Sequence, residues 1–334
     1  MYDPSVRMRV ILRCGVARAA WLLLCIAAPG AVAAGCGDGD SEASGDELTV
    51  VATTTQVADF VRNVGGNRVD VHGILGTEAD PHEYEPRPSD VGAIGDAPVV
   101  FKSGGDIDGW LDELIDNAGG DPHVVSLIDS VRTIRGDAHE DEEEAQADDE
   151  VDPHWWEDPH NAIRAVGVIR DALIEADRSG RETYARNAAA YLRKLEALDR
   201  GIADCMRRVP VDKRKLVTTH DALGYFAARY DVEVVGALIP SLSTQAQPSA
   251  RDIDELVDQI REEDVEAIFP ETALNERLET AVSREAGAEV GGQLWADALG
   301  PEGSGGETYL DAMRGNADTM ARGMSRDAVS CSAH

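Results

Sequence analysis

RETYARNAAAYLRKLEALDRGIADCMRRV occupies residues 181–209 of the chain. The stretch contains one glycine and no proline, and its apolar side chains recur at helical spacing, at Tyr184, Ala188, Tyr191, Leu195, Leu198 and Ile202. The pattern predicts one helix of about 28 residues, or about 42 Å at 1.5 Å per residue. A single stiff helix in the middle of a chain differs from paired flexible crossovers, so we expect residues 181–210 to join two lobes that close only slightly.

On both sides of this helix, short β-branched runs alternate with helical stretches. Strands are predicted at Leu48–Ala52, 69–75, Val99–Lys102, 124–126, 215–219, 232–238, 266–269 and 289–294, with helices such as Ala250–Glu262 and 275–286 between them. Such alternation is typical of parallel sheets with right-handed crossovers. The predicted fold class is therefore α/β, with two parallel-sheet βα lobes at residues 48–180 and 211–334 and the long rigid helix between them.

Four candidate metal ligands are distributed over this pattern: His82, His154, His220 and Asp297. Imidazole nitrogen combined with carboxylate oxygen suits Zn²⁺, and four protein ligands leave little room for an activated water. Zinc fingers take their ligands in pairs a few residues apart, whereas no two of these four are neighbours. If the four meet, the metal lies in the cleft between the lobes, because open parallel sheets place ligands beyond the carboxyl ends of their strands.

The contexts of these residues resemble, in order, the metal motifs of the zinc/manganese class of ABC-importer solute-binding proteins. The four motifs are GTEADPHEYEPRPSD at 76–90, DPHWWEDPHN at 152–161, THDALGYF at 219–226 and LWADAL at 294–299. The resemblance covers nearly the whole mature chain. It implies two lobes bridged by one helix, with His82 and His154 from the first lobe and His220 and Asp297 from the second. It also implies a membrane permease as partner, and a zinc metallochaperone is a further candidate partner.

The third ligand bears on the choice of metal. In the family that the motifs resemble, His at this position tends to accompany zinc importers and Glu manganese importers, and this chain has His220. Three nitrogens and one carboxylate also suit Zn²⁺ better than the oxygen-preferring Mn²⁺. We therefore expect high-affinity binding of Zn²⁺ in preference to Mn²⁺, with the ion as cargo that is delivered to an ABC-type importer.

Other ligands and other functions are weighed against this interpretation. His160 is the nearest rival ligand, and the remaining histidines are expected to be ordinary polar residues: His72, His123, His139 and His334. A zinc-dependent hydrolase needs an open coordination position, and the sequence contains neither a His-Glu-x-x-His helix nor a nucleophile elbow, so no enzyme is expected. A surface adhesin-like lipoprotein is the other alternative, which the acidic composition neither supports nor excludes.

The first residues predict export. Four arginines precede an apolar run at 19–34 that is too short, and too interrupted by Pro29 and Gly30, for a membrane span, so residues 1–35 are predicted to be a signal peptide. The sequence AAGC at 33–36 resembles a bacterial lipobox, which makes Cys36 the lipid-anchored residue and 36–47 a flexible tether. We expect a monomer on the outer face of the cytoplasmic membrane, or in the periplasm if the leader is simply cleaved.

The mature chain is strongly acidic. Losing four Arg and one Asp with the leader moves the formal charge from −32 to −35, which argues against nucleic acid as a partner. The loop 137–151 is predicted to be mobile because residues 139–150 hold eight carboxylates and one histidine. Either a solvated loop or a weak metal collector fits this composition. Nearby Trp155 and Trp156 are expected in the core, with shielding of the metal as the alternative.

Two cysteines remain in the mature chain besides Cys36. Exported proteins meet oxidising conditions, so Cys205 and Cys331 are predicted to form a disulfide bond between the end of the central helix and the C-terminal segment. Two unpaired cysteines are the alternative, because connectivity does not follow from sequence.

Overall fold

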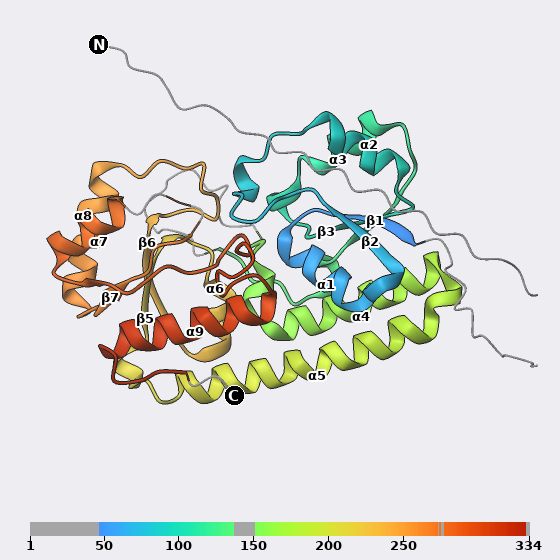
Figure 1. Ribbon diagram of the computed structural model, residues 1–334. Coiled ribbons are helices and arrows are strands. Elements are labelled where there is room, and N and C mark those ends of the chain that lie inside the picture. The colour runs from blue at the N-terminus through green and yellow to red at the C-terminus, as the bar shows by residue number, and fades with distance from the viewer. Residues whose placement is uncertain (1–46, 137–150, 273, 275–276, 332–334) are drawn as a thin grey trace, which may run out of the picture. The chain divides into compact units, whose positions relative to one another are not determined.

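The central helix, α5, spans Arg181–Met206 in the computed structural model (Figure 1). Its buried side includes all six of the apolar residues whose spacing predicts it. The helix ends before the predicted 209 because the chain turns ahead of Pro210: Arg208 N donates to Cys205 O at 2.9 Å and Val209 N to Met206 O at 3.1 Å.

The structure describes residues 47–136, 151–272, 274 and 277–331. The predicted leader, Cys36, nearly all of the tether and the acidic run at 137–150 lie outside these residues. Contacts within the chain separate residues 1–43 from residues 44–334, and the description that follows concerns the second unit alone.

The N-terminal lobe is a parallel sheet with the strand order β2-β1-β3-β4. Its strands are β1 Leu48–Ala52, β2 Val69–Gly73, β3 Val99–Lys102 and β4 His123–Ser126, and its connecting helices are α1 Thr55–Gly65, α2 Pro88–Asp96 and α3 Leu111–Ala118. The last three residues of β1 and the first three of β3 are buried, as expected of central strands in a parallel sheet that is covered on both faces.

The C-terminal lobe repeats this arrangement. Its strands are β5 Lys215–His220, β6 Glu233–Ile239, β7 Ala267–Ile268 and β8 Glu289–Val290, and its helices are α6 Gly224–Tyr230, α7 Ala250–Glu262 and α8 Arg277–Ala286. Strand β5 pairs with β6, β7 pairs with β8, and a parallel bridge between Thr218 and Phe269 joins the two pairs in the order β6-β5-β7-β8. The predicted strand 289–294 is shorter, because Gly292 has φ +115°, and pairing resumes only at Leu294.

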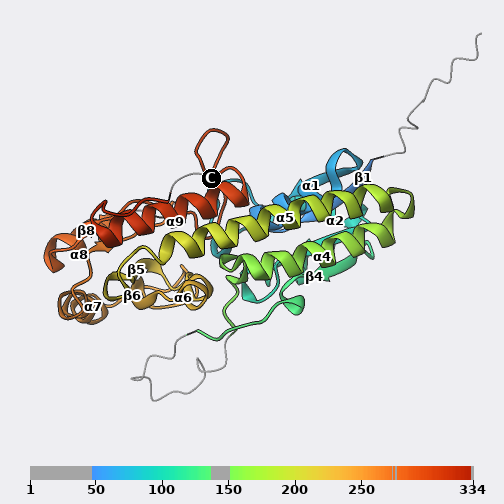
Figure 2. The same cartoon turned by 90° about the horizontal axis from the view of Figure 1, so that it is seen from below.

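Three helices run alongside one another beneath the two sheets: α4 Pro159–Ala176, α5 and α9 Tyr309–Ser325 (Figure 2). Helix α5 packs against α1 and α4 of the first lobe, against α6 of the second lobe and against α9. One hydrophobic core includes Val50 and Phe101 from the first lobe and Leu216 and Phe269 from the second. The lobes are therefore joined by continuous packing as well as by the chain.

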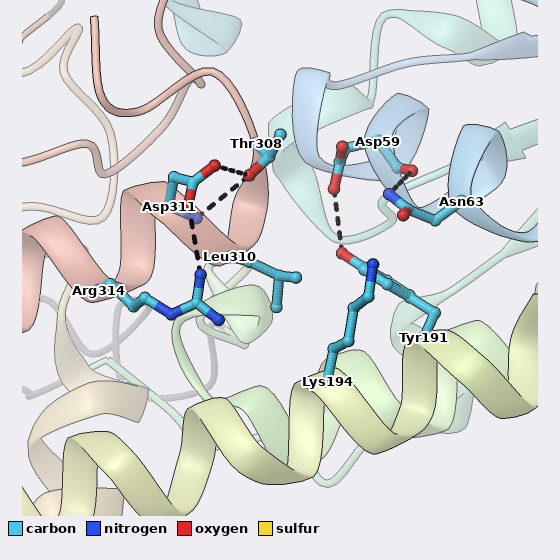
Figure 3. A pocket seen from close by; sticks show the side chains of 8 residues that line it. All are labelled: Asp59, Asn63, Tyr191, Lys194, Thr308, Leu310, Asp311 and Arg314. Carbon is cyan, nitrogen blue, oxygen red and sulfur yellow. Dashed lines mark hydrogen bonds and ion pairs between the residues drawn. The ribbon is translucent and has the colours of Figure 1, made fainter. Parts of the chain in front are cut away.

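Asp59 links its own helix, α1, to α5 and α9 (Figure 3). Its Oδ2 accepts a hydrogen bond from Tyr191 Oη of α5 at 3.0 Å and lies 3.4 Å from Tyr309 N at the start of α9. Burial is the main cause that raises the pKa of Asp59. Lys194 and Arg314 line the surface pocket beside it. A carboxylate at the N-terminus of α9 also complements the helix dipole.

At the other end of α5, Cys205 is disulfide-bonded to Cys331, with Cα atoms 5.3 Å apart. Arg208 donates to the carbonyl oxygen of Ser330 at 2.6 Å, and Cys331 N donates to Asp318 Oδ1 at 2.6 Å. The C-terminal segment is thus fixed to both α5 and α9.

Candidate metal centre

His82 lies in the loop after β2, in a short 3₁₀ turn at Pro81–Glu83. Asp80 caps this turn, because its Oδ1 accepts from His82 N at 2.9 Å. Pro81 is buried and occupies the first helical position, where its missing N–H costs nothing. The turn presents the imidazole of His82 toward the space between the lobes.

His154 belongs to the segment that follows the acidic run. An antiparallel bridge pairs Arg135 with Val151, and Asp152 N donates to Ile134 O at 3.1 Å, so this segment is bonded to the residues that precede 137. Asp152 Oδ1 then accepts from both the backbone N and the Nδ1 of His154, each at 2.8 Å. Because Nδ1 carries the donated proton, Nε2 is left with its lone pair available for a metal.

His220 is the last residue of β5 and is held in the same way. Glu271, just after β7, accepts from His220 N through Oε1 at 2.9 Å and from His220 Nδ1 through Oε2 at 2.6 Å. The two histidines are thus oriented by two buried carboxylates, one from each lobe.

Asp297 lies in the loop after β8, but the first lobe positions this loop. The carbonyl oxygen of Ala296 accepts from Gln56 Nε2 at 3.2 Å and from Trp156 Nε1 at 3.0 Å. Leu299 N donates to Thr55 Oγ1 at 2.9 Å. A ligand that the second lobe supplies is therefore oriented by the first.

The structure brings the four predicted ligands together, with one donor atom from each lying within 4.8 Å of the others. Asp297 oxygens lie 3.6 Å from His82 Nε2, 3.4 Å from His154 Nε2 and 3.3 Å from His220 Nε2. The two Nε2 atoms of His154 and His220 are 3.4 Å apart. A tetrahedral ion with bonds of about 2.0–2.1 Å has ligand atoms separated by about 3.3 Å, and these four distances are close to that separation.

The site is also polarised electrostatically. Burial, with the neighbouring histidines, lowers the pKa of His82 to about 3 and that of His154 well below its usual value. Burial also acts to lower the pKa of His220, but the charges of Glu271 and Asp297 outweigh it and raise that pKa to about 10. Burial raises the pKa of Asp297 to about 7. Of the three imidazoles, His220 is therefore the one whose surroundings favour the protonated ring.

Another acidic side chain, Glu157, is buried near the four candidate ligands. Glu157 is buried, and neither of its carboxyl oxygens has a hydrogen-bond partner within the described parts of the chain. Burial, followed by repulsion from Asp297 and Glu271, raises its pKa well above the usual value. Burial therefore favours the protonated, uncharged form of Glu157.

The rival ligand His160 is not part of the group. Its side chain is 53% exposed, and its Nε2 lies 2.9 Å from Arg229 Nη2 and 3.4 Å from Asp199. Trp155 and Trp156 are buried in the core as predicted, and the Trp156 ring also packs against His154 at 5.5 Å between ring centroids.

Sequence reasoning did not identify the carboxylates that orient the ligands. Asp152 is the first residue of the second metal motif, two residues before His154, and this position indicates that it could orient the histidine. Glu271 follows a predicted strand and Pro270, which is a weaker indication of such a role. The ordering of Asp297 by Gln56 had no signal, because it depends on contact between lobes that lie far apart in sequence.

Comparison with known proteins identifies the family of the chain. The family described as zinc-uptake complex component A, periplasmic, matches residues 50–323. The chain belongs to this family. The zinc-uptake component family is a family of solute-binding proteins of metal ABC transporters, so the chain is a binding protein and not an enzyme.

Individual relatives of the family span almost the same length. The manganese-binding lipoprotein MntA of Halalkalibacterium halodurans is 37% identical over 297 residues, which cover 88% of this chain and 95% of that protein. The metal ABC transporter substrate-binding lipoprotein SloC of Streptococcus mutans is 32% identical over 286 residues, 84% and 91% of the two chains. The solved structure of the periplasmic zinc-binding protein TroA of Treponema pallidum superposes with a TM-score of 0.75 at 26% identity, covering 84% of this chain and all of that one.

The family's periplasmic description agrees with the export that the leader predicts. Within the described ranges, no helix has both the length and the apolar character needed to cross a bilayer.

Proposed function

We propose that this component of a metal ABC importer captures Zn²⁺ outside the cytoplasmic membrane, with His82, His154, His220 and Asp297 as its four ligands, and delivers the ion to the importer's permease. The observation that carries the proposal is the convergence of four donor atoms, from four separate segments, within 4.8 Å of one another. The orientation of the His154 and His220 rings supports it too, since Nδ1 of each is held by a carboxylate and Nε2 faces the other ligands.

The choice of Zn²⁺ over Mn²⁺ rests on the donor set. Three imidazole nitrogens and one carboxylate match the preference of Zn²⁺, whereas Mn²⁺ prefers octahedral sites that are rich in oxygen. The names of the relatives point both ways, because MntA is named as manganese-binding and TroA as zinc-binding. His220 is the donor whose identity bears most directly on this choice.

The proposal includes anchoring of the protein by a lipid on Cys36. The AAGC sequence at 33–36 supports this, and both curated relatives are named as lipoproteins. Mass spectrometry of the membrane-extracted protein tests it, because lipidation adds the mass of acyl chains to a mature chain that begins at Cys36.

The ligand assignment is tested by the affinity for Zn²⁺ in competition with a chromophoric chelator. We expect His220→Ala to weaken binding by at least about 100-fold, because it removes a direct ligand of the ion and leaves the buried Glu271 Oε2 without its hydrogen bond from Nδ1. His160→Ala is the matched control and should bind as the parent does. Parental affinity in His220→Ala would contradict the assignment.

The choice of metal is tested by equilibrating the protein with equal concentrations of Zn²⁺ and Mn²⁺ and measuring the bound ions. The parent should hold predominantly Zn²⁺. In His220→Glu a nitrogen is exchanged for oxygen, so the ratio of bound Zn²⁺ to Mn²⁺ should fall. A parent that retains mainly Mn²⁺ under these conditions would exclude the zinc assignment while leaving the ligands in place.

A further inference from the structure

The side chain of Asp80, at the edge of the site, is hydrogen-bonded to both lobes. Asp80 of the first lobe accepts from His82 N through Oδ1 at 2.9 Å and from Thr244 Oγ1 of the second lobe through Oδ2 at 2.7 Å. The neighbouring Gln245 donates from its side-chain Nε2 to the carbonyl oxygen of His82. Asp80 and Thr244 are 164 positions apart, and Thr244 lies in the segment between β6 and α7.

We propose that Asp80, Thr244 and Gln245 form an interlobe clasp that positions His82 and sets the rate at which the ion leaves. The inference rests on the proposed metal-binding function. It makes Asp80 and Thr244 positioning residues, which act on the ion through His82.

The clasp acts on the ligand that is least enclosed. The side chain of His82 is 7% exposed, whereas those of His154 and His220 are fully buried. His154 and His220 are oriented through their ring Nδ1 by Asp152 and Glu271. The clasp instead holds His82 through its backbone N–H and C=O. Departure of the second-lobe segment would therefore loosen His82 before the other ligands.

The two hydrogen bonds of Asp80 also couple ligand geometry to lobe position. A hydroxyl that donates to an ionised carboxylate makes one of the stronger kinds of hydrogen bond. Because the same carboxylate caps the turn that carries His82, a shift of Thr244 changes the cap as well. Any movement of the lobes that displaces Thr244 therefore also changes the orientation of His82.

The test is the rate of Zn²⁺ dissociation from the full-length protein, measured by stopped flow against a fluorescent chelator. Thr244→Val removes the hydroxyl and keeps the shape of the side chain. We expect it to increase the dissociation rate about tenfold, which is the effect of losing a hydrogen bond to a charged group, and to leave the association rate near that of the parent. Thr244→Ser keeps the hydroxyl and should restore the parental rate. Gln245→Ala should also accelerate dissociation.

A double-mutant cycle identifies the path of the effect. If Thr244 acts through Asp80, the Asp80→Ala/Thr244→Val protein should release Zn²⁺ at the same rate as Asp80→Ala alone. Additive effects of the two substitutions, or a parental dissociation rate in Thr244→Val, would overturn the clasp. A parent that binds neither Zn²⁺ nor Mn²⁺ would instead overturn the proposed function, so the two failures are distinguishable.

Discussion

At the scale of single residues, the proton on His220 governs how the site accepts a metal. Its pKa is raised to about 10 because Glu271 and Asp297 stabilise the charged ring. A metal needs the Nε2 lone pair, so binding must expel this proton. Acid opposes this loss, and metal affinity must therefore fall as pH falls.

We expect the dissociation constant for Zn²⁺ to rise about tenfold for each unit of pH lost between about 9 and 7, and more steeply below, where Asp297 also takes up a proton. In Glu271→Gln the charge that holds the proton is gone, so the dependence should be shallower. The same variant should lower zinc affinity at pH 8 by about 10–100-fold, because the ring loses its orienting carboxylate. Glu263→Gln, at the exposed ion pair with Lys215, is the matched control. A pH-independent affinity in the parent would show that no proton leaves.

Glu157 has a different consequence, for stability. Its pKa in the folded protein lies well above the ordinary 4.5, so the folded state keeps its proton at pH values where the unfolded chain has lost it. The stability of the fold therefore declines as pH rises above about 4.5, until the carboxyl ionises. Glu157→Gln keeps the shape and cannot ionise.

We therefore expect Glu157→Gln to unfold at a higher urea concentration than the parent at pH 8, with a smaller difference at pH 5. The exposed Glu175→Gln on α4 serves as control and should leave the midpoint unchanged at both pH values. Equal midpoints for Glu157→Gln and the parent at pH 8 would mean that the buried carboxyl does not lower the free energy of unfolding at that pH.

At the scale of elements, local patterns predicted what local forces determine. Leu48–Ala52 and Val99–Lys102 are strands at the predicted residues, and Ala250–Glu262 is a helix at the predicted residues. The start of that helix is decided by a capping box, in which Ser249 and Asp252 exchange hydrogen bonds. The strand predicted at 289–294 was too long, because its apolar composition does not reveal the backbone of Gly292.

The site was predictable to the extent that each ligand follows the end of a strand or lies in a recognisable motif. The partners Glu271 and Thr244 were not, because Glu271 reaches His220 through the pairing of distant strands within the second lobe and Thr244 reaches Asp80 only where the two lobes meet. The spacing of residues in the sequence does not reveal such contacts. The raised pKa of Glu157 was not predictable either, because it depends on burial in the folded protein.

The Cys205–Cys331 bond links elements 126 positions apart. In the chain-entropy description, a closed loop of this length stabilises the fold by about 4–5 kcal/mol. We expect the double substitution Cys205→Ser/Cys331→Ser to lower the melting temperature clearly and to leave zinc affinity unchanged, because the bond joins α5 to the C-terminal segment and not to any ligand. Treatment of the parent with a reductant should reproduce the loss, and an unchanged melting temperature after verified reduction would contradict it.

At the scale of the whole binding unit, residues 44–334, helix α5 and the core that crosses it limit how far the lobes separate. We expect small-angle scattering of the metal-free and zinc-loaded protein to differ little, with changes concentrated near His82 and the clasp segment. Hydrogen exchange should locate these changes at residues 80–85 and 241–246. An increase of many ångströms in the largest dimension on removal of zinc would show that the lobes hinge widely.

The continuous core has a consequence for how the protein denatures. Two lobes of similar topology, each with its own sheet, are usually expected to melt as independent domains. Here Leu216 and Phe269 share one apolar cluster with Val50 and Phe101, and α9 packs against both α5 and α1. Neither half can lose its structure without exposing the buried surface of the other, so heat should produce one cooperative transition whose calorimetric and van't Hoff enthalpies agree. The duplicated architecture is, thermodynamically, a single folding unit.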